Sequence, residues 1–138
     1  MNPVGHDFGE LRRLRRARDR MDRDYADPLD VAALASTACM SPAHFSRRFR
    51  AVYSETPYSY LISRRIERAQ SLLRRGGMSV TEVCIAVGFS SLGSFSAKFT
   101  DVVGESPSAY RIRDHEQLSG LAACHAMVVT RPRRPKAP

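Results

Sequence analysis

Arginine supplies almost all the positive charge of this chain, and its guanidinium group suits contact with nucleic acid. The 138 residues include 22 lysines and arginines, of which only Lys98 and Lys136 are lysine, against 14 acidic residues. The formal net charge is +8, and the isoelectric point is near 10.1. Because guanidinium donates forked hydrogen bonds to phosphate and to guanine edges, this composition predicts a polyanionic partner. A genome of matching base composition would produce the same bias, so both explanations stay open.

The other reactive residue types form no recognisable enzyme or metal site. The cysteines are widely spaced and lack a C-x-x-C pair: Cys39, Cys84 and Cys124. The four histidines have no ligand spacing, so we expect no metal, no cofactor and no disulfide framework, and we interpret the cysteines as small buried residues. No paired carboxylates, phosphate-binding loop or activated nucleophile can be assembled, which argues against an enzyme. No apolar run reaches the roughly 18 residues of a membrane span, and residues 1–11 lack a secretory signal. We therefore expect a cytoplasmic, nucleoid-associated protein that makes no membrane contact.

Helix-start signals recur along the chain. Four prolines follow a residue with a short oxygen-bearing side chain: Asp27-Pro28, Ser41-Pro42, Thr56-Pro57 and Ser106-Pro107. The side-chain oxygen accepts an amide that the first helical turn leaves unpaired, and proline has no amide to leave unpaired. Ser79–Glu82 adds a capping box. With strand alternation nearly absent, these signals predict an all-α fold of seven helices, near 8–24, 28–38, 42–53, 57–75, 80–87, 92–103 and 107–116.

An internal repeat organises these helices into two similar units. A shift of 50 residues superposes Phe45, Ser46, Phe49, Val52, Glu55, Pro57 and Tyr60 on identical residues, Phe95 to Tyr110. Residues 31–40 match 80–89 at a shift of 49, so the second copy has one extra residue in its turn. Each copy predicts a short helix, a tight turn and a second helix. We expect helix-turn-helix units at 8–56 and 77–116, a linker helix at 57–76 and a basic, flexible tail at 117–138.

The second helix of each copy has one apolar face and one outward face. At about 100° per residue, Phe45 and Phe49 lie on the buried face, and we interpret them as core anchors rather than base-stacking residues. The outward side carries Ala43, Arg47 and Arg50, with His44 at its edge. A helix that is anchored from behind and presents cations and small residues in front fits a DNA major groove.

These patterns match a known family. Residues 79–111 closely resemble the C-terminal signature of that family, in which GFSS, F-x-x-x-F and G-x-S-P-x-x-Y-R occur in this order. The sequence of this segment is SVTEVCIAVGFSSLGSFSAKFTDVVGESPSAYR. The family is that of the AraC/XylS-type transcriptional regulators. Its first helix-turn-helix resembles LAST-AC-MSPAHFSRRFR, and its linker helix resembles IERAQSLL. The resemblance covers residues 8–113 and implies a seven-helix, bipartite domain whose two recognition helices enter successive major grooves on one face of double-stranded DNA.

The resemblance also implies which positions read bases. In the first recognition helix these are Ala43, Ser46 and Arg47, with His44 adjacent, and in the second they are Leu92, Gly93, Ser96 and Ala97. We expect phosphate contacts from Ser41, Arg48, Arg50, Ser91, Ser94 and Lys98. The second helix departs from a base-reading pattern because it offers no long, forked hydrogen-bonding side chain on its outer face, where it has glycine, alanine and serine. Our hypothesis is that Arg47 and the first unit carry most sequence readout, while the second unit mainly positions the protein.

Other segments leave alternatives open. Cys39 stands where the family often has glycine, so we expect a rearranged or slightly strained turn, at a cost of about 1 kcal/mol. The arginine run of residues 12–23 is interleaved with aspartates and is compatible with a solvated, partly self-paired face. Residues 131–136 are either a disordered tail or a basic segment that lies along DNA phosphates. Residues 118–130 are apolar and match nothing in the family.

The sequence therefore predicts a sequence-specific DNA-binding transcription regulator. Since only seven residues precede the first helix, we expect a stand-alone DNA-binding domain that binds an asymmetric site of roughly 20 bp as a monomer, with DNA bending to meet both units. By resemblance, activation through RNA polymerase is the commoner outcome. The alternative is a protein-interaction module that titrates a partner or RNA polymerase without reading DNA. The second recognition helix keeps this alternative open, because its outer face carries only small residues.

Overall fold

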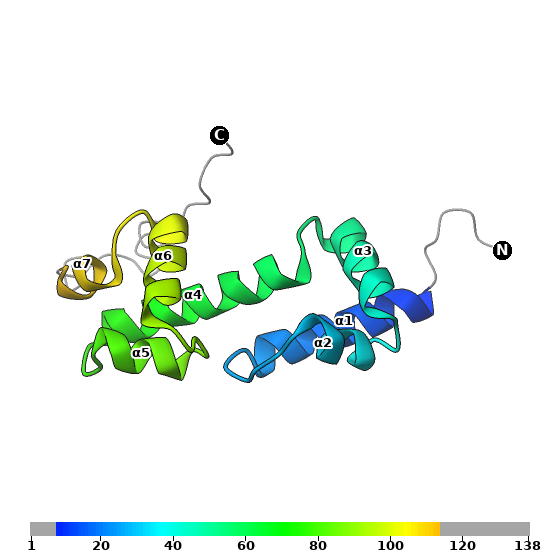
Figure 1. Cartoon of the computed structure of the whole chain (residues 1–138), viewed down its shortest axis with the longest axis horizontal. Coiled ribbons are helices and arrows are strands. Elements are labelled where there is room, and N and C mark those ends of the chain that lie inside the picture. The colour runs from blue at the N-terminus through cyan, green and yellow to red at the C-terminus, as the bar shows by residue number, and fades with distance from the viewer. Residues whose placement is uncertain (1–7, 114–138) are drawn as a thin grey trace, which may run out of the picture. The chain divides into compact units, whose positions relative to one another are not determined.

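The computed structural model describes residues 8–113, and these form helices joined by short turns (Figure 1). The helices are α1 (Phe8–Arg23), α2 (Val31–Thr37), α3 (Pro42–Tyr53), α4 (Pro57–Arg75), α5 (Val80–Ala86), α6 (Leu92–Val103) and α7 (Pro107–Ile112). No strand occurs within this range, so the predicted all-α, seven-helix fold is confirmed. The last helix ends at Ile112 rather than near residue 116, because Arg113 adopts an extended conformation. Within residues 8–113, no helix is long and apolar enough to cross a membrane.

Oxygen-bearing side chains cap the helices at most predicted starts. Ser41 and Ser106 accept the amides of His44 and Ala109, and Ser79 forms the predicted capping box. The expected start of α2 at Pro28 is wrong: its cap is Asp30, whose Oδ1 accepts the Ala33 amide at 2.7 Å. The Asp27-Pro28 pair lies in the preceding loop.

A buried arginine explains why that loop is not helical. Arg65 of α4 donates from Nε to the Tyr25 carbonyl at 2.6 Å and from Nη2 to the Asp27 carbonyl at 2.8 Å. With the carbonyl of Asp27 held by a side chain, α2 begins four residues later, at Val31, and takes Asp30 as its cap. Burial lowers the pKa of Arg65 from its ordinary value.

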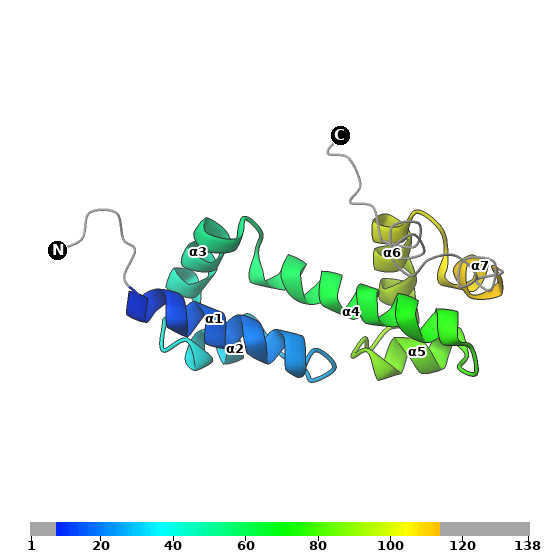
Figure 2. The same ribbon diagram turned by 180° about the vertical axis from the view of Figure 1, so that it is seen from behind.

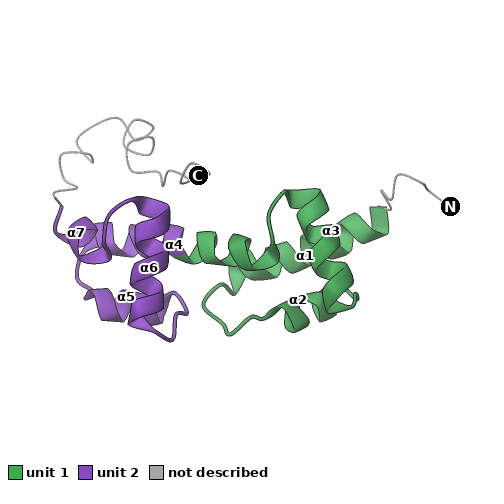
Figure 3. Cartoon of the chain, turned by 45° about the horizontal axis from the view of Figure 1, so that its top comes forward, with its two compact units in different colours: residues 1–65 green, residues 66–138 purple. Residues whose placement is uncertain are grey.

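The chain divides into two compact units, residues 1–65 and residues 66–138, and α4 contributes to both (Figure 3). In unit 1, helices α1, α2 and α3 contact one another, and α1 is seen in front of α2 in the view from behind (Figure 2). The core of unit 1 consists of Leu14, Ala17, Met21, Leu34, Ala35, Ala38, Phe45, Phe49 and Leu61. The core residues of unit 2 include Ile66, Ala69, Leu73, Val83, Cys84, Val87, Phe95, Phe99 and Tyr110.

The repeat seen in the sequence recurs in the aromatic packing. The ring centroids of Phe45 and Phe49 lie 5.6 Å apart, and those of Phe95 and Phe99 lie 5.7 Å apart. Each second phenylalanine also packs edge-on against the tyrosine 11 residues later, with centroids 5.8 Å apart for Tyr60 and 5.5 Å apart for Tyr110. All four phenylalanines are fully buried, which confirms them as core anchors.

The hydroxyls of these two tyrosines have partners of opposite charge. Tyr60 donates to Asp22 Oδ1 at 2.7 Å, and burial together with this contact raises the pKa of Tyr60. Tyr110 instead accepts from Arg74 Nη1 at 2.8 Å. Since a buried hydroxyl without a partner is costly, each contact fixes the tyrosine that supports its recognition helix.

Part of the α1 arginine run is structural. Arg13 donates from Nε to the Ala38 carbonyl at 3.1 Å, and Arg20 donates from Nη1 to Thr37 Oγ1 at 2.7 Å. Arg18 stacks over the Tyr53 ring, 4.9 Å from its centroid. These side chains satisfy and shield the C-terminal end of α2 and the last turn of α3, so the run is only partly a solvated face.

The turns of unit 1 adopt left-handed conformations without glycine. Cys39, between α2 and α3, has φ 56°, and the matching residue of unit 2 is Gly88, with φ 98°. Ser54, after α3, has φ 64°, and its counterpart is Gly104, with φ 92°. The expected strain at Cys39 is thus borne out by its φ angle, but the prediction that Cys39 is buried is wrong, because the turn exposes it. Cys84 is buried as predicted, and Cys124 lies outside the described residues, as do residues 118–136.

Candidate nucleic-acid interface

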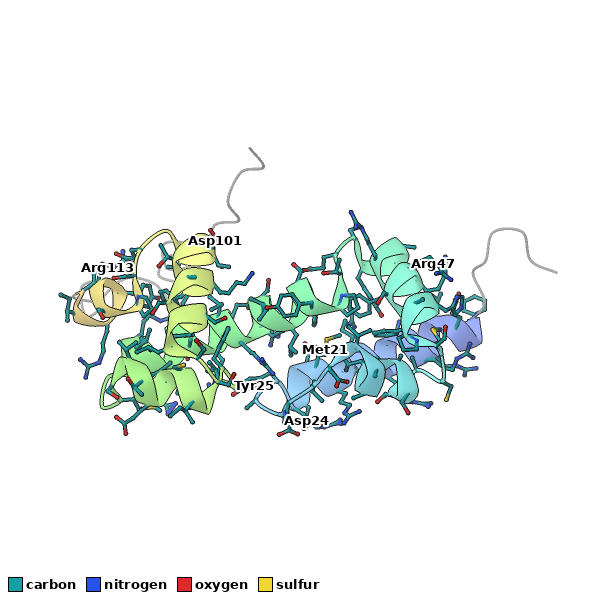
Figure 4. The ribbon with its side chains drawn as sticks, viewed as in Figure 1. Met21, Asp24, Tyr25, Arg47, Asp101 and Arg113 are labelled. Carbon is teal, nitrogen blue, oxygen red and sulfur yellow. The ribbon has the colours of Figure 1, made fainter. Side chains whose placement is uncertain are left out.

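Helix α3 presents a polar, positively charged side whose back is fixed in the core of unit 1. Phe45 and Phe49 are fully buried. The residues predicted to face a groove or its phosphates are mostly exposed: Ser41, Ala43, His44, Arg47 and Arg50 are exposed, and Ser46 is half-buried. Arg47 projects from this side of α3 (Figure 4). Because α3 is anchored by two aromatic rings, the guanidinium groups of Arg47 and Arg50 are carried on a rigid support.

One edge of α3 is tied to α1 by a carboxylate that the sequence analysis missed. Glu10 is only 8% exposed. Its Oε1 accepts from Arg48 Nε at 2.9 Å and lies 3.6 Å from His44 Nε2. A signal for this contact was present: Glu10 stands four residues before Leu14 on the apolar stripe of α1, and a carboxylate on such a stripe requires a buried partner. Arg48, predicted to contact phosphate, is therefore engaged by the protein itself.

Helix α6 is anchored in the same way but presents different chemistry. Phe95 and Phe99 are fully buried, and Ser91 caps the helix by accepting the Ser94 amide at 3.2 Å. Leu92, Gly93, Ser94 and Ala97 are exposed, while Ser96 and Lys98 are half-buried. A Cβ atom on Gly93 would meet only Ser91 Oγ at 3.8 Å, so packing does not require glycine there. The exposed part of α6 carries Asp101 near its C-terminal end (Figure 4) and no exposed cation.

No group of His, Cys, Asp and Glu in residues 8–113 is arranged to hold a metal ion. Glu105 and Arg113 form an ion pair beside Tyr110 in unit 2, and Arg23 pairs with Asp24 in unit 1. These contacts are exposed or half-exposed, where ion pairs contribute little free energy. The candidate residues for DNA contact therefore lie on two separate surfaces, the outward side of α3 in unit 1 and that of α6 in unit 2.

Comparison with known proteins decides the family. A family described as "Helix-turn-helix domain" matches residues 34–113, more than half of the chain. The MmsAB operon regulatory protein of Pseudomonas aeruginosa is 39% identical over 92 residues, which cover 67% of this chain and 30% of that protein. A putative AraC-like transcription regulator of Streptomyces lividans is 36% identical over 91 residues, which cover 66% of this chain and 30% of that protein. The chain belongs to the AraC-type helix-turn-helix family of DNA-binding transcription regulators. It spans under a third of the length of these two relatives.

Solved AraC-type domains share the fold. The DNA-binding domain of AdpA, a global transcriptional factor solved in complex with a target DNA, has a TM-score of 0.68 and 36% identity. The match covers 71% of this chain and 88% of that domain. The C-terminal domain of AraT, a response regulator from Geobacillus stearothermophilus, has a TM-score of 0.69 and 27% identity, with 72% and 83% covered. The expected resemblance to AraC-type regulators is thereby confirmed.

Proposed function

We propose that this AraC-type chain regulates transcription by binding a specific DNA sequence through the outward sides of α3 and α6. The observation that carries the proposal is the exposed, arginine-bearing side of α3, held from behind by the buried pair of Phe45 and Phe49. A major groove accepts such a helix. The AdpA domain with target DNA, 36% identical, supports duplex DNA as the partner.

Within this proposal the two recognition helices have unequal roles. Arg47 donates two hydrogen bonds to O6 and N7 of a guanine, a contact that discriminates against other bases by about 1–3 kcal/mol. His44, Ala43 and Ser46 complete the reading side of α3. On α6 the reading residues are Leu92, Gly93, Ser96 and Ala97, which suit contact with thymine methyl groups. Ser41, Arg50, Ser91, Ser94 and Lys98 hold the phosphates on either side.

The proposal extends to how the site is built and used. Two different helices in one chain suit an asymmetric site of about 20 bp bound by a monomer, since each unit reads one major groove. Bending of the duplex brings both grooves to their helices. Activation through contact with RNA polymerase in the cytoplasm is the regulatory outcome that we propose.

A second candidate function has one observation in its favour. The exposed side of α6 carries no cation, and Leu92 on it is 45% exposed. Such a surface suits a protein partner, so a module that titrates a partner without reading DNA is the competing proposal.

An electrophoretic shift assay separates the two functions. The purified chain is titrated into labelled genomic fragments with competitor DNA over a salt series. Site-selective binding at least ~10³-fold tighter than non-specific binding supports the regulator. Uniform binding that disappears with salt supports the interaction module.

A further inference from the structure

We propose that Glu10 limits the affinity of this protein for DNA of any sequence, by holding Arg48 on the protein and away from DNA phosphates. The proposal rests on the proposed function, since it concerns the same recognition helix. A cation that contacts phosphate strengthens binding to every sequence alike. A carboxylate that engages this cation therefore lowers the affinity for the target site and for other sequences by the same factor, and makes both less dependent on salt.

The contacts place Glu10 where it can act on α3. Its Oε1 accepts the Nε–H of Arg48 at 2.9 Å, and the Arg48 side chain is 25% exposed. His44 Nε2, one turn earlier on the same edge of α3, lies 3.6 Å from the same oxygen. Arg48 follows Arg47 directly in sequence, so a duplex read by Arg47 brings phosphates close to this edge.

Helix α4, whose apolar stripe has the same spacing as that of α1, indicates that packing alone does not require a carboxylate here. The core residues Leu14, Ala17 and Met21 of α1 have the same spacing as Ile66, Ala69 and Leu73 of α4, all buried. In this register, Glu10 corresponds to Ile62, which is 7% exposed.

An aliphatic side chain is thus accepted at a position of matching burial. The feature that distinguishes Glu10 is its negative charge, and the groups that it contacts are the Arg48 guanidinium and the His44 ring of α3.

The test compares two variants that change the net charge equally. Glu10→Gln keeps an oxygen that can accept from Arg48 but removes the charge. Asp19→Asn removes one charge from an exposed position of the same helix. The natural chain and each variant are titrated with two duplexes, one of mixed sequence and one that carries the target site found by selection from random duplexes. The titrations run from 50 to 200 mM NaCl.

We expect Glu10→Gln to gain one phosphate contact, which steepens the salt slope by about 0.9. Over this fourfold salt range, its non-specific affinity then falls about 3.5-fold further than that of the natural chain. The salt slope of Asp19→Asn stays that of the natural chain, and the ratio of specific to non-specific affinity stays constant in both variants. Equal effects of the two variants would overturn the proposal, because net charge alone would then explain them.

A second pair of variants keeps the proposal testable if Glu10→Gln folds poorly. Arg48→Gln leaves the salt slope of the natural chain unchanged, whereas Arg50→Gln, at an exposed position, lowers it. A slope that drops by about 0.9 in Arg48→Gln means that Arg48 already binds phosphate, and the proposal is wrong. If the natural chain prefers no sequence at all, the proposed function fails, and the slopes still report on Glu10 separately.

Discussion

The left-handed backbone conformation of Cys39 in unit 1 should lower the stability of the fold by an amount that a substitution can measure. An L-residue in this region costs roughly 1–2 kcal/mol, and Cys39 has φ 56° while its repeat counterpart is a glycine. Replacing Cys39 by glycine relieves that cost but adds conformational entropy to the unfolded chain, worth about 0.4–1 kcal/mol. Because Cys39 is exposed and loses no core packing, the expected net stabilisation of Cys39→Gly is about 0.5–1 kcal/mol.

Urea and thermal unfolding followed by circular dichroism measure this effect. For a unit of this size, the expected increase in the midpoint temperature is about 3–6 °C. Cys39→Ala is the control, because it removes the thiol and keeps a left-handed L-residue, so it should leave the midpoint nearly unchanged. The reciprocal change is Gly104→Ser. A Cβ atom at Gly104 would meet no atom within 4 Å, so this substitution should destabilise unit 2 through the left-handed backbone. A midpoint temperature of Cys39→Gly that is no higher than that of Cys39→Ala would refute the expected relief of strain.

Two further predictions concern pH. Tyr60→Phe loses the hydrogen bond to Asp22, so its free energy of unfolding should be about 1 kcal/mol lower than that of the natural chain. Because the pKa of Tyr60 is raised in the fold, stability should decline as the pH rises above about 10. Tyr60→Phe should decline less, and equal declines would contradict this assignment. Ser79→Ala should cost about 1 kcal/mol. Since hydrogen bonds from Ser79, first of all that of its backbone N–H, lower the pKa of Glu82, the advantage of the natural chain over Glu82→Gln should be present above about pH 4.3 and decrease as the pH falls. An advantage independent of pH would count against the capping box.

Much of the fold follows from local signals in the sequence. Ser41-Pro42 and Ser106-Pro107 start helices because their caps need only neighbouring amides. The 50-residue repeat predicts the packing of Phe49 on Tyr60 and of Phe99 on Tyr110, since side chains at equal spacing on equal elements meet in the same way. The start of α2 was mispredicted because the deciding contact, from Arg65 to the Asp27 carbonyl, joins residues 38 apart.

The candidate interface is less well determined by the sequence. The outward positions of α3 and α6 follow from the 3.6-residue period, and the structure leaves most of them exposed. The engagement of Arg48 by Glu10 does not follow from that period, because it depends on how α1 crosses α3. The exposure of Cys39 likewise depends on the geometry of a turn, where helical periodicity gives no guidance.

Selection of binding sites from random duplexes tests the central claim most directly. The natural chain should enrich one asymmetric motif of about 20 bp. Arg47→Ala should keep the rest of the motif but lose the preference for guanine at one position, by about 5- to 150-fold. Enrichment of no motif, or an unchanged motif with Arg47→Ala, would contradict sequence reading by the outward side of α3.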